Sequence, residues 1–163
     1  MTKKTRGSNY DPAEDIIGFT CGAMDLFHAG HVLMLKEARE NCDYLIVGLH
    51  TDPTLDRSEK NRPIQSLEER RIQLEGCGYV DEIMEYDTEE QLHFVLETLY
   101  EKWGKKFVRF IGMDWLGKKY TGHELPIIMH FNERDHDYSS SELRDRIYNA
   151  EAEKKKKNSI VNP

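Results

Sequence analysis

Apolar and polar positions alternate along this chain in blocks that predict strands and helices in turn. Continuous apolar runs fall at residues 16–21 and 44–49, and short runs of this kind are typical of strands buried on both faces. Between them, apolar side chains from Val32 to Ala38 recur at helical spacing, which predicts a helix over residues 30–41. These three segments form a first β-α-β unit.

The same alternation continues through the rest of the chain. Ser66 and Glu69 form a capping box that predicts a helix from Leu67 to about Glu75, with Arg70 and Arg71 on its exposed side. Further strands are predicted over residues 80–86, 107–113 and 126–131, and further helices over residues 88–103 and from 139–141 to about 150. Strands that alternate with helices imply an α/β fold with a doubly wound, parallel, five-stranded sheet and right-handed crossovers.

Chain length and local composition predict a single domain with polar ends. The 163 residues suit one domain, which we place at residues 15–150. Residues 1–14 are polar and basic and are expected to form a disordered leader, while the lysine-rich tail over residues 151–163 is expected to be solvated. Residues 56–63 are expected to form a long, mobile loop that carries positive charge.

Charge and cysteine content narrow the classes of partner and compartment. The net charge is −7, with 23 basic and 30 acidic residues, so no excess of positive charge favours nucleic acid. No apolar run approaches the roughly 18 residues of a membrane helix, and the N-terminus lacks the apolar core of a signal peptide. The three cysteines are odd in number and lie in or beside apolar segments, which favours reduced thiols and a cytoplasmic protein.

The stretch over residues 22–31 carries the clearest chemistry. It places two imidazoles, two glycines and a carboxylate between a predicted strand and a predicted helix. The free backbone N–H groups and positive dipole end of a helix favour an anion there. His31 falls in the first helical turn, His28 lies one turn earlier, and Gly30 lets the backbone approach a ligand closely. The pattern predicts a site that grips a triphosphate.

The histidine pair has two other interpretations, a metal site and a purely structural role. A His-x-x-His pair can bind a metal, but zinc usually needs two more ligands, and neither a Cys-x-x-Cys pair nor a carboxylate-flanked histidine lies nearby in the sequence. We therefore disfavour a metal site. Histidines packed at a helix end for structural reasons are the remaining alternative.

Topology makes the triphosphate interpretation stronger. In an open parallel sheet, ligands bind beyond the carboxyl ends of the strands, near the point where strand order reverses. Three polar loops follow predicted strands at that edge, at residues 22–31, 112–118 and 132–141. We therefore expect one site to gather side chains from distant parts of the chain, namely His28, His31, Asp114, Arg134, Ser139, Ser140 and Ser141.

These motifs, taken in order, resemble those of the nucleotidyltransferases with the His-x-Gly-His signature, a cytidylyltransferase-like family, and most closely its glycerol-3-phosphate cytidylyltransferases. The resemblance covers residues from about Ile16 to Ile147. It implies a Rossmann-like sheet of nucleotidyltransferase type. The matching pieces are residues 20–31, 43–48 with 51–52, 69–70, 79–83, 112–115 and 139–141.

The resemblance implies that CMP is transferred from CTP to a small phosphorylated alcohol similar to glycerol 3-phosphate, with release of pyrophosphate. It also implies Mg²⁺ held by the triphosphate rather than by protein side chains, and a homodimer. The catalytic residues it implies are His28, His31, Lys60 and Arg134, and the substrate-binding residues are Arg62 and Arg70. The implied nucleotide-binding residues are Cys21, Gly22, Ala23, Met24, Asp25, His28, Gly30, His31, Lys60, Gly112, Asp114, Arg134, Ser139, Ser140 and Ser141.

Departures from the family pattern keep other functions open. Gly78, Met113 and residues 135–138 differ from the residues common in the family, which leaves the base and the acceptor undecided. Residues 61–64 and 67–71 also resemble heptose-phosphate adenylyltransferases, and a catalytically silent nucleotide-binding module is a third alternative. The catalytic core of a class I aminoacyl-tRNA synthetase shares the His-x-Gly-His feature but is strongly disfavoured, because it needs a far longer chain and a basic RNA-binding surface. For the dimer, the helical positions Leu92, Leu96 and Leu99 fit either an interface or the core.

Overall fold

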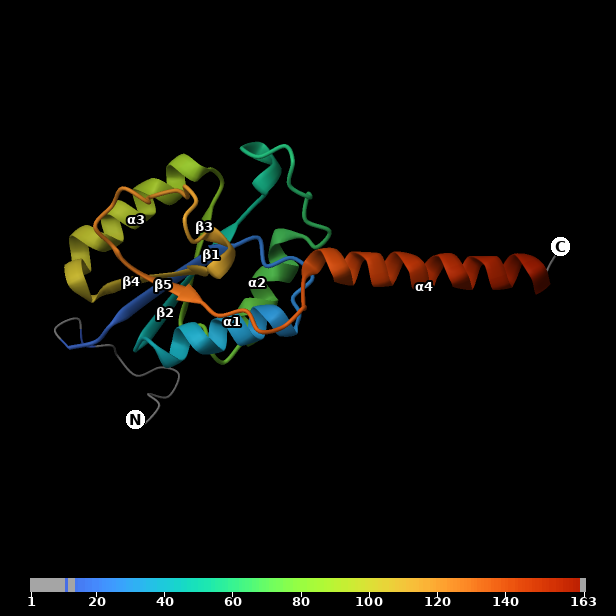
Figure 1. Cartoon of the computed structure of the whole chain (residues 1–163), viewed down its shortest axis with the longest axis horizontal. Coiled ribbons are helices and arrows are strands. Elements are labelled where there is room, and N and C mark those ends of the chain that lie inside the picture. Colours follow the sequence, from blue (N-terminus) through green and yellow to red (C-terminus); the bar gives the residue numbers. More distant parts are fainter. Residues whose placement is uncertain (1–10, 12–13, 162–163) are drawn as a thin grey trace.

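Five parallel strands form the centre of the computed structural model, which describes residue 11 and residues 14–161 (Figure 1). The strand order β3-β2-β1-β4-β5 reverses between β1 and β4, so the α/β, doubly wound, parallel five-stranded fold predicted from the sequence is confirmed. Nearly all of the expected disordered leader lies outside the described residues. The strands are β1 (Ile17–Gly22), β2 (Tyr44–His50), β3 (Glu82–Tyr86), β4 (Phe107–Gly112) and β5 (Ile128–Asn132).

In the described part of the chain, three α-helices and three short 3₁₀ turns connect the strands, and a fourth α-helix follows β5. The helices are α1 (Ala29–Glu40), α2 (Leu67–Gly76), α3 (Glu89–Trp103) and α4 (Ser140–Val161), and the 3₁₀ turns span Pro53–Leu55, Gly104–Lys106 and Met113–Trp115. The predicted capping box at Ser66 and Glu69 is present, and Thr88 caps α3 by accepting from the N–H of Gln91. None of the described helices is long and apolar enough to cross a membrane.

The sheet separates two apolar cores, because alternate strand residues point to opposite faces. On one face, Val47 and Phe110 pack with Leu35 of α1 and Leu74 of α2. On the other face, Phe19, Ile46 and Phe107 pack against α3. Burial on both faces explains why the sequences of β1 and β2 are continuous apolar runs.

The leucines considered for a dimer interface belong to the second core. Leu92, Leu96 and Leu99 all lie on the buried side of α3 and contact the sheet. They are therefore unavailable to a second subunit, and the core interpretation of these positions is correct.

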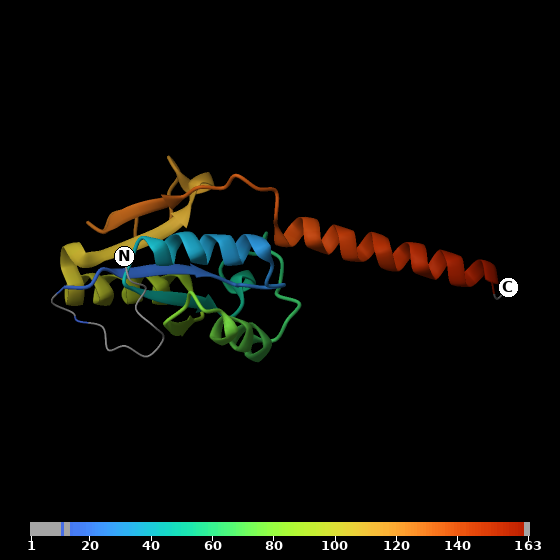
Figure 2. The same ribbon diagram turned by 90° about the horizontal axis from the view of Figure 1, so that it is seen from below.

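The last helix is longer than predicted. We expected α4 to end near Ala150, but it continues to Val161 and projects away from the domain (Figures 1 and 2). No glycine or proline interrupts the chain between Ser140 and Val161, and alanine, glutamate and lysine in this stretch are good helix formers. The lysine-rich tail is therefore solvated, as predicted, but helical over its described part.

Candidate active site

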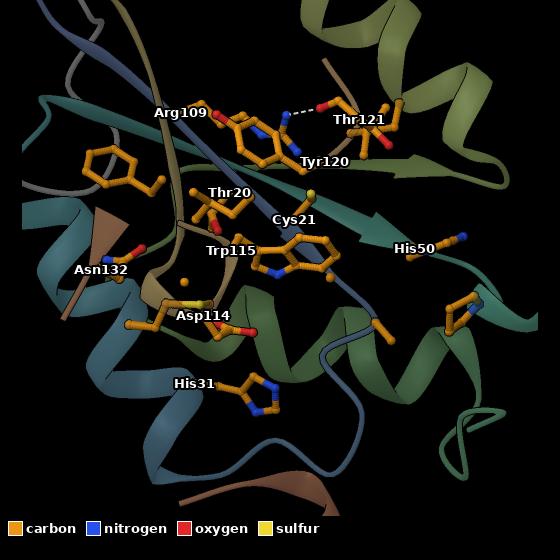
Figure 3. Close-up of a pocket in the computed structure, with 18 of the residues that line it drawn as sticks. Thr20, Cys21, His31, His50, Arg109, Asp114, Trp115, Tyr120, Thr121 and Asn132 are labelled. Atoms are coloured by element: carbon orange, nitrogen blue, oxygen red, sulfur yellow. Dashed lines mark hydrogen bonds between the residues drawn. The ribbon is translucent and has the colours of Figure 1, made fainter. Parts of the chain in front are cut away.

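A cavity of about 890 Å³ opens at the carboxyl ends of the strands, beside the point where strand order reverses (Figure 3). All three loops expected to meet there contribute to its lining. The cavity brings together the predicted residues Cys21, Gly22, Ala23, His28, Gly30, His31, Lys60, Gly112, Asp114, Arg134, Ser139 and Ser140. Ser141, the remaining serine of the predicted set, does not line it.

The two histidines form a reciprocal cap at the start of α1. His28 is the N-cap residue, and its Nδ1 accepts from the N–H of Gly30 at 3.0 Å. The Nδ1 of His31 accepts from the N–H of His28 at 3.2 Å. Because each Nδ1 acts as an acceptor, both neutral imidazoles carry their proton on Nε2. Both rings line the cavity and can donate to a ligand there.

Gly30 is needed for this arrangement. A Cβ at this position would lie 2.9 Å from Cε1 of His28 and 2.9 Å from the carbonyl oxygen of Tyr138. Either contact is closer than carbon tolerates, so any larger residue would displace the His28 ring or the 132–141 loop. Glycine here permits the close approach of His28 and Tyr138, while the approach of a ligand to Gly30 stays a prediction.

The N-terminus of α4 meets that of α1 at the histidine pair. The Oγ of Ser140 lies 3.2 Å from Nε2 of His28 and 3.2 Å from the carbonyl oxygen of Asp25. Ser140 donates to the carbonyl, and its oxygen can therefore accept from His28. The N-termini of α1 and α4 thus lie close together (Figure 1), and residues at both, with the positive dipole ends behind them, line the cavity.

Both histidines are neutral at pH 7. Burial, helped by the adjacent His28, lowers the pKa of His31 to about 4. Burial also lowers the pKa of His28, with smaller contributions from His136 and Arg134. The site therefore presents N–H donors without a fixed positive charge on either ring.

Two residues predicted to bind nucleotide instead shape the loop from inside. Met24 packs in the core, and the buried carboxylate of Asp25 accepts from the N–H groups of Ile64 and Gln65. Asp25 also pairs with Arg144 of α4 at 2.5 Å. Neither Met24 nor Asp25 lines the cavity, so each positions the 22–31 loop rather than facing a ligand.

Arg70 corrects a prediction made from the helical pattern. We expected it on the exposed side of α2, but only 2% of the residue is exposed. Its guanidinium donates to the carbonyl oxygens of Gln65, Ala23, His50 and Thr51. It does not line the cavity, and it acts by joining three loops beneath the site rather than by contacting substrate.

Replacing Arg70 with methionine should lower the free energy of unfolding by about 3 kcal/mol, because four carbonyl oxygens lose a charged donor in a buried position. Chemical denaturation measures this change. Arg71→Met is the matched control, since Arg71 pairs at the surface with Glu85 and its loss should cost less than about 1 kcal/mol. Equal losses in the two variants would contradict the assigned role.

The predicted cations lie at the rim of the cavity or outside it. Lys60 lines the cavity and is exposed, as is Arg134, whose Nη2 donates to the carbonyl oxygen of Tyr138 at 3.2 Å. The side chain of Arg62 is 83% exposed and pairs with Asp52 at 3.4 Å, away from the lining. Lys60 and Arg134 are therefore placed to meet a bound anion, and Arg62 would have to move to do so.

Sequence reasoning missed the half of the cavity that faces α3. Arg57 forms an ion pair with Glu89, and Glu89 accepts a second hydrogen bond from the hydroxyl of Thr121. The N–H of Glu89 donates to Asp56 at 2.6 Å, while Arg109 donates to the carbonyl of Thr121 (Figure 3). Three loops are joined by this network. His50 also lines this half and could have been found, because it directly follows a predicted strand.

Metal ligands are not grouped in the described part of the chain. Within residue 11 and residues 14–161, no three histidine, cysteine, aspartate or glutamate side chains are arranged to hold a metal ion.

Comparison with known proteins shows which families and proteins the chain is similar to. The pattern of the family described as cytidylyltransferase-like matches residues 19–146. An ethanolamine-phosphate cytidylyltransferase from Arabidopsis thaliana is 50% identical over 64 residues, which are 39% of this chain and 15% of that protein. The bifunctional protein HldE from Campylobacter concisus is 36% identical over 108 residues, 66% of this chain and 22% of that protein. The match thus spans less than a quarter of either relative.

A solved structure supports the fold. The lipopolysaccharide core biosynthesis protein from Thermoplasma volcanium matches with a TM-score of 0.57 and 22% identity, over 74% of this chain and 99% of that one. At 22% identity, the match is evidence for the arrangement of the sheet and helices and not for a function.

Proposed function

Because the chain belongs to the cytidylyltransferase-like family, we propose that it transfers CMP from CTP to a small phosphorylated alcohol and releases pyrophosphate. The observation that carries this proposal is the pair of Nε2–H imidazoles at the joined N-termini of α1 and α4. A phosphate acceptor is already anionic, so the reaction requires no general base. The chain has to position the two substrates and stabilise the charge that develops between them.

In this proposal the triphosphate lies over the two helix N-termini. His31 donates through Nε2 to the α-phosphate, where negative charge builds up as the acceptor oxygen attacks, and His28 does so when the ligand displaces the Oγ of Ser140 from its Nε2–H. Lys60 and Arg134 close the rim with positive charge, and Ser139 offers a hydroxyl donor. Magnesium, which keeps much of its water shell and prefers oxygen ligands, would be carried by the phosphate oxygens of the nucleotide.

The acceptor would lie in the half of the cavity that faces α3. Ethanolamine phosphate is one candidate, because an ethanolamine-phosphate cytidylyltransferase from Arabidopsis thaliana is 50% identical over 64 residues. A protein named probable ethanolamine-phosphate cytidylyltransferase, from Encephalitozoon cuniculi, is 50% identical over 66 residues. Glycerol 3-phosphate is the other, from the overall motif pattern. ATP with a heptose phosphate is a second candidate function, supported by the resemblance of residues 61–64 and 67–71 to heptose-phosphate adenylyltransferases.

A panel of nucleoside triphosphates and acceptors tests the proposal. The purified protein is incubated with each of CTP, ATP, GTP and UTP, against ethanolamine phosphate, glycerol 3-phosphate, choline phosphate and a heptose phosphate. We expect pyrophosphate release with CTP to exceed that with ATP by about tenfold or more. Turnover confined to ATP and heptose phosphate would establish the second candidate instead. Nucleotide binding by calorimetry without turnover for any pair would overturn the proposal and indicate a silent binding module.

A further inference from the structure

The side chain of Asn132 is buried in the cavity wall with its amide unpaired. Asn132 is the last residue of β5, lines the cavity and is 3% exposed (Figure 3). Among the residues that the structure describes, neither its Oδ1 nor its Nδ2 has a hydrogen-bond partner. Buried polar atoms nearly always have partners, and leaving both ends of one amide unpaired is unfavourable. This amide is therefore suited to a ligand that enters the cavity.

The surroundings of Asn132 suit a flat group with apolar faces. In the sheet, Asn132 pairs in register with Gly112, where a side chain would collide with the carboxylate of Asp114. Two residues earlier on the same strand, His130 contacts Glu37 of α1, so Asn132 points to the α1 side as well. Met34 of α1 and Phe110 of β4 line this side of the cavity with apolar surface.

The position of Asn132 differs in charge from the part of the cavity that would bind phosphate. His28 and His31 stand at the helix N-termini, and the cations Lys60 and Arg134 lie at the rim. The neutral amide of Asn132 offers one donor and one acceptor side by side, which match the edge of a nucleobase better than a phosphate. Cytosine presents the complementary pair, an amino group beside a ring nitrogen.

We propose that the Asn132 amide recognises the nucleobase of the bound nucleotide. This inference rests on the proposed function, because it takes the nucleotide to be CTP. The carbonyl Oδ1 accepts from the 4-amino group of cytosine, and Nδ2 donates to ring N3. Asn132 is then a specificity-determining residue at one end of the cavity, with the reacting phosphates at the two histidines.

A binding cycle that pairs one substitution with one nucleotide analogue tests this contact. The substitution is Asn132→Leu, which keeps the branching of the side chain and removes both polar atoms. The analogue is the triphosphate of pyrimidin-2-one riboside, which is CTP without its 4-amino group. We expect the parent protein to bind CTP about tenfold more tightly than the analogue in calorimetry, and Asn132→Leu to bind the two almost equally.

Stability and kinetics distinguish recognition from a structural role. The ligand-free Asn132→Leu protein should melt at the same temperature or higher, because an unpaired buried amide is removed. Its KM for CTP should rise while kcat changes little. Gln73→Met on α2 is the matched control: Gln73 Oε1 is also buried without a partner among the described residues, and Gln73 does not line the cavity. It should leave the CTP-to-analogue ratio unchanged.

The outcomes separate this inference from the proposed function. An equal CTP-to-analogue ratio in the parent and Asn132→Leu proteins would overturn the assignment of Asn132 even if CMP transfer proceeds. A fall in melting temperature with no change in the ratio would also overturn it, by showing a structural role. The ratio could instead fall to about one in the variant although the protein transfers CMP to no acceptor. That result would support the base contact and would contradict only the proposed catalysis.

Discussion

Replacing His31 with alanine should lower the turnover of CMP transfer by about a hundredfold or more while CTP affinity falls far less. The Nε2–H of His31 faces the cavity from the first turn of α1, and its Nδ1 is already used by the backbone of His28. A donor held in this way contributes most where charge builds up at the α-phosphate in the transition state. Steady-state kinetics with saturating acceptor, together with calorimetry for CTP, measure the two effects separately.

His28 needs two variants, because it caps α1 as well as facing the cavity. His28→Ala removes the cap and should cost about 1 kcal/mol of stability in addition to its effect on turnover. His28→Asn can still accept from the N–H of Gly30, so it should keep the stability of the parent and still lose turnover. Normal turnover and normal melting temperature in His31→Ala and His28→Asn would show that these histidines have no part in the chemistry.

The burial of the histidines explains why their role depends on geometry more than on charge. Because desolvation lowers the pKa of His31 to about 4, the ring enters the reaction neutral at pH 7. A triphosphate beside it favours the protonated form, so ligand binding and proton uptake are coupled at this position. The Nε2–H tautomer is fixed before the ligand arrives, which reduces the rearrangement required in the transition state.

The part of the site that the sequence predicted is the part built from contiguous residues. Strand, loop and helix follow one another over residues 17–40, so spacing alone places His28 and His31 at a helix start. The general rule for parallel sheets then brings the 112–118 and 132–141 loops to the same edge. Both steps depend on local pattern and topology, which a sequence carries.

The missed residues depend on contacts between segments distant in the sequence. Arg70 is buried because four carbonyl groups from residues 23, 50, 51 and 65 accept hydrogen bonds from it. The hydrophobic periodicity of α2 does not indicate these contacts. The partners Arg57, Glu89 and Thr121 come from three separate segments without a shared motif. Asn132 is distinguished only by lacking a partner among the described residues, which is a property of packing rather than of spacing.

The other large effect is expected at Arg57, in the half of the cavity that faces α3, where we propose that the acceptor binds. Its ion pair with Glu89 joins the segment after β2 to the start of α3, and its guanidinium lies 5.9 Å from the centre of the Trp115 ring. Although burial alone raises the pKa of Glu89, hydrogen bonds from Thr121 and Arg57 outweigh it and lower that pKa. Glu89 is therefore a half-buried carboxylate whose ionised form is favoured by Thr121 and Arg57 together.

Arg57→Met should raise the KM for the acceptor by about thirtyfold. Without the ion pair, the segment after β2 is no longer held against the start of α3, and the proposed acceptor site loses its fixed geometry. CTP affinity, measured without acceptor, should change little, since the two histidines lie in the other half of the cavity.

Arg39→Met is the matched control: Arg39 and Asp81 form a similarly half-buried pair at 3.2 Å, and neither residue lines the cavity. That variant should lose stability but keep the acceptor KM of the parent. Equal acceptor KM values in Arg57→Met, Arg39→Met and the parent would limit Arg57 to a structural role and would move the acceptor out of the α3 half of the cavity.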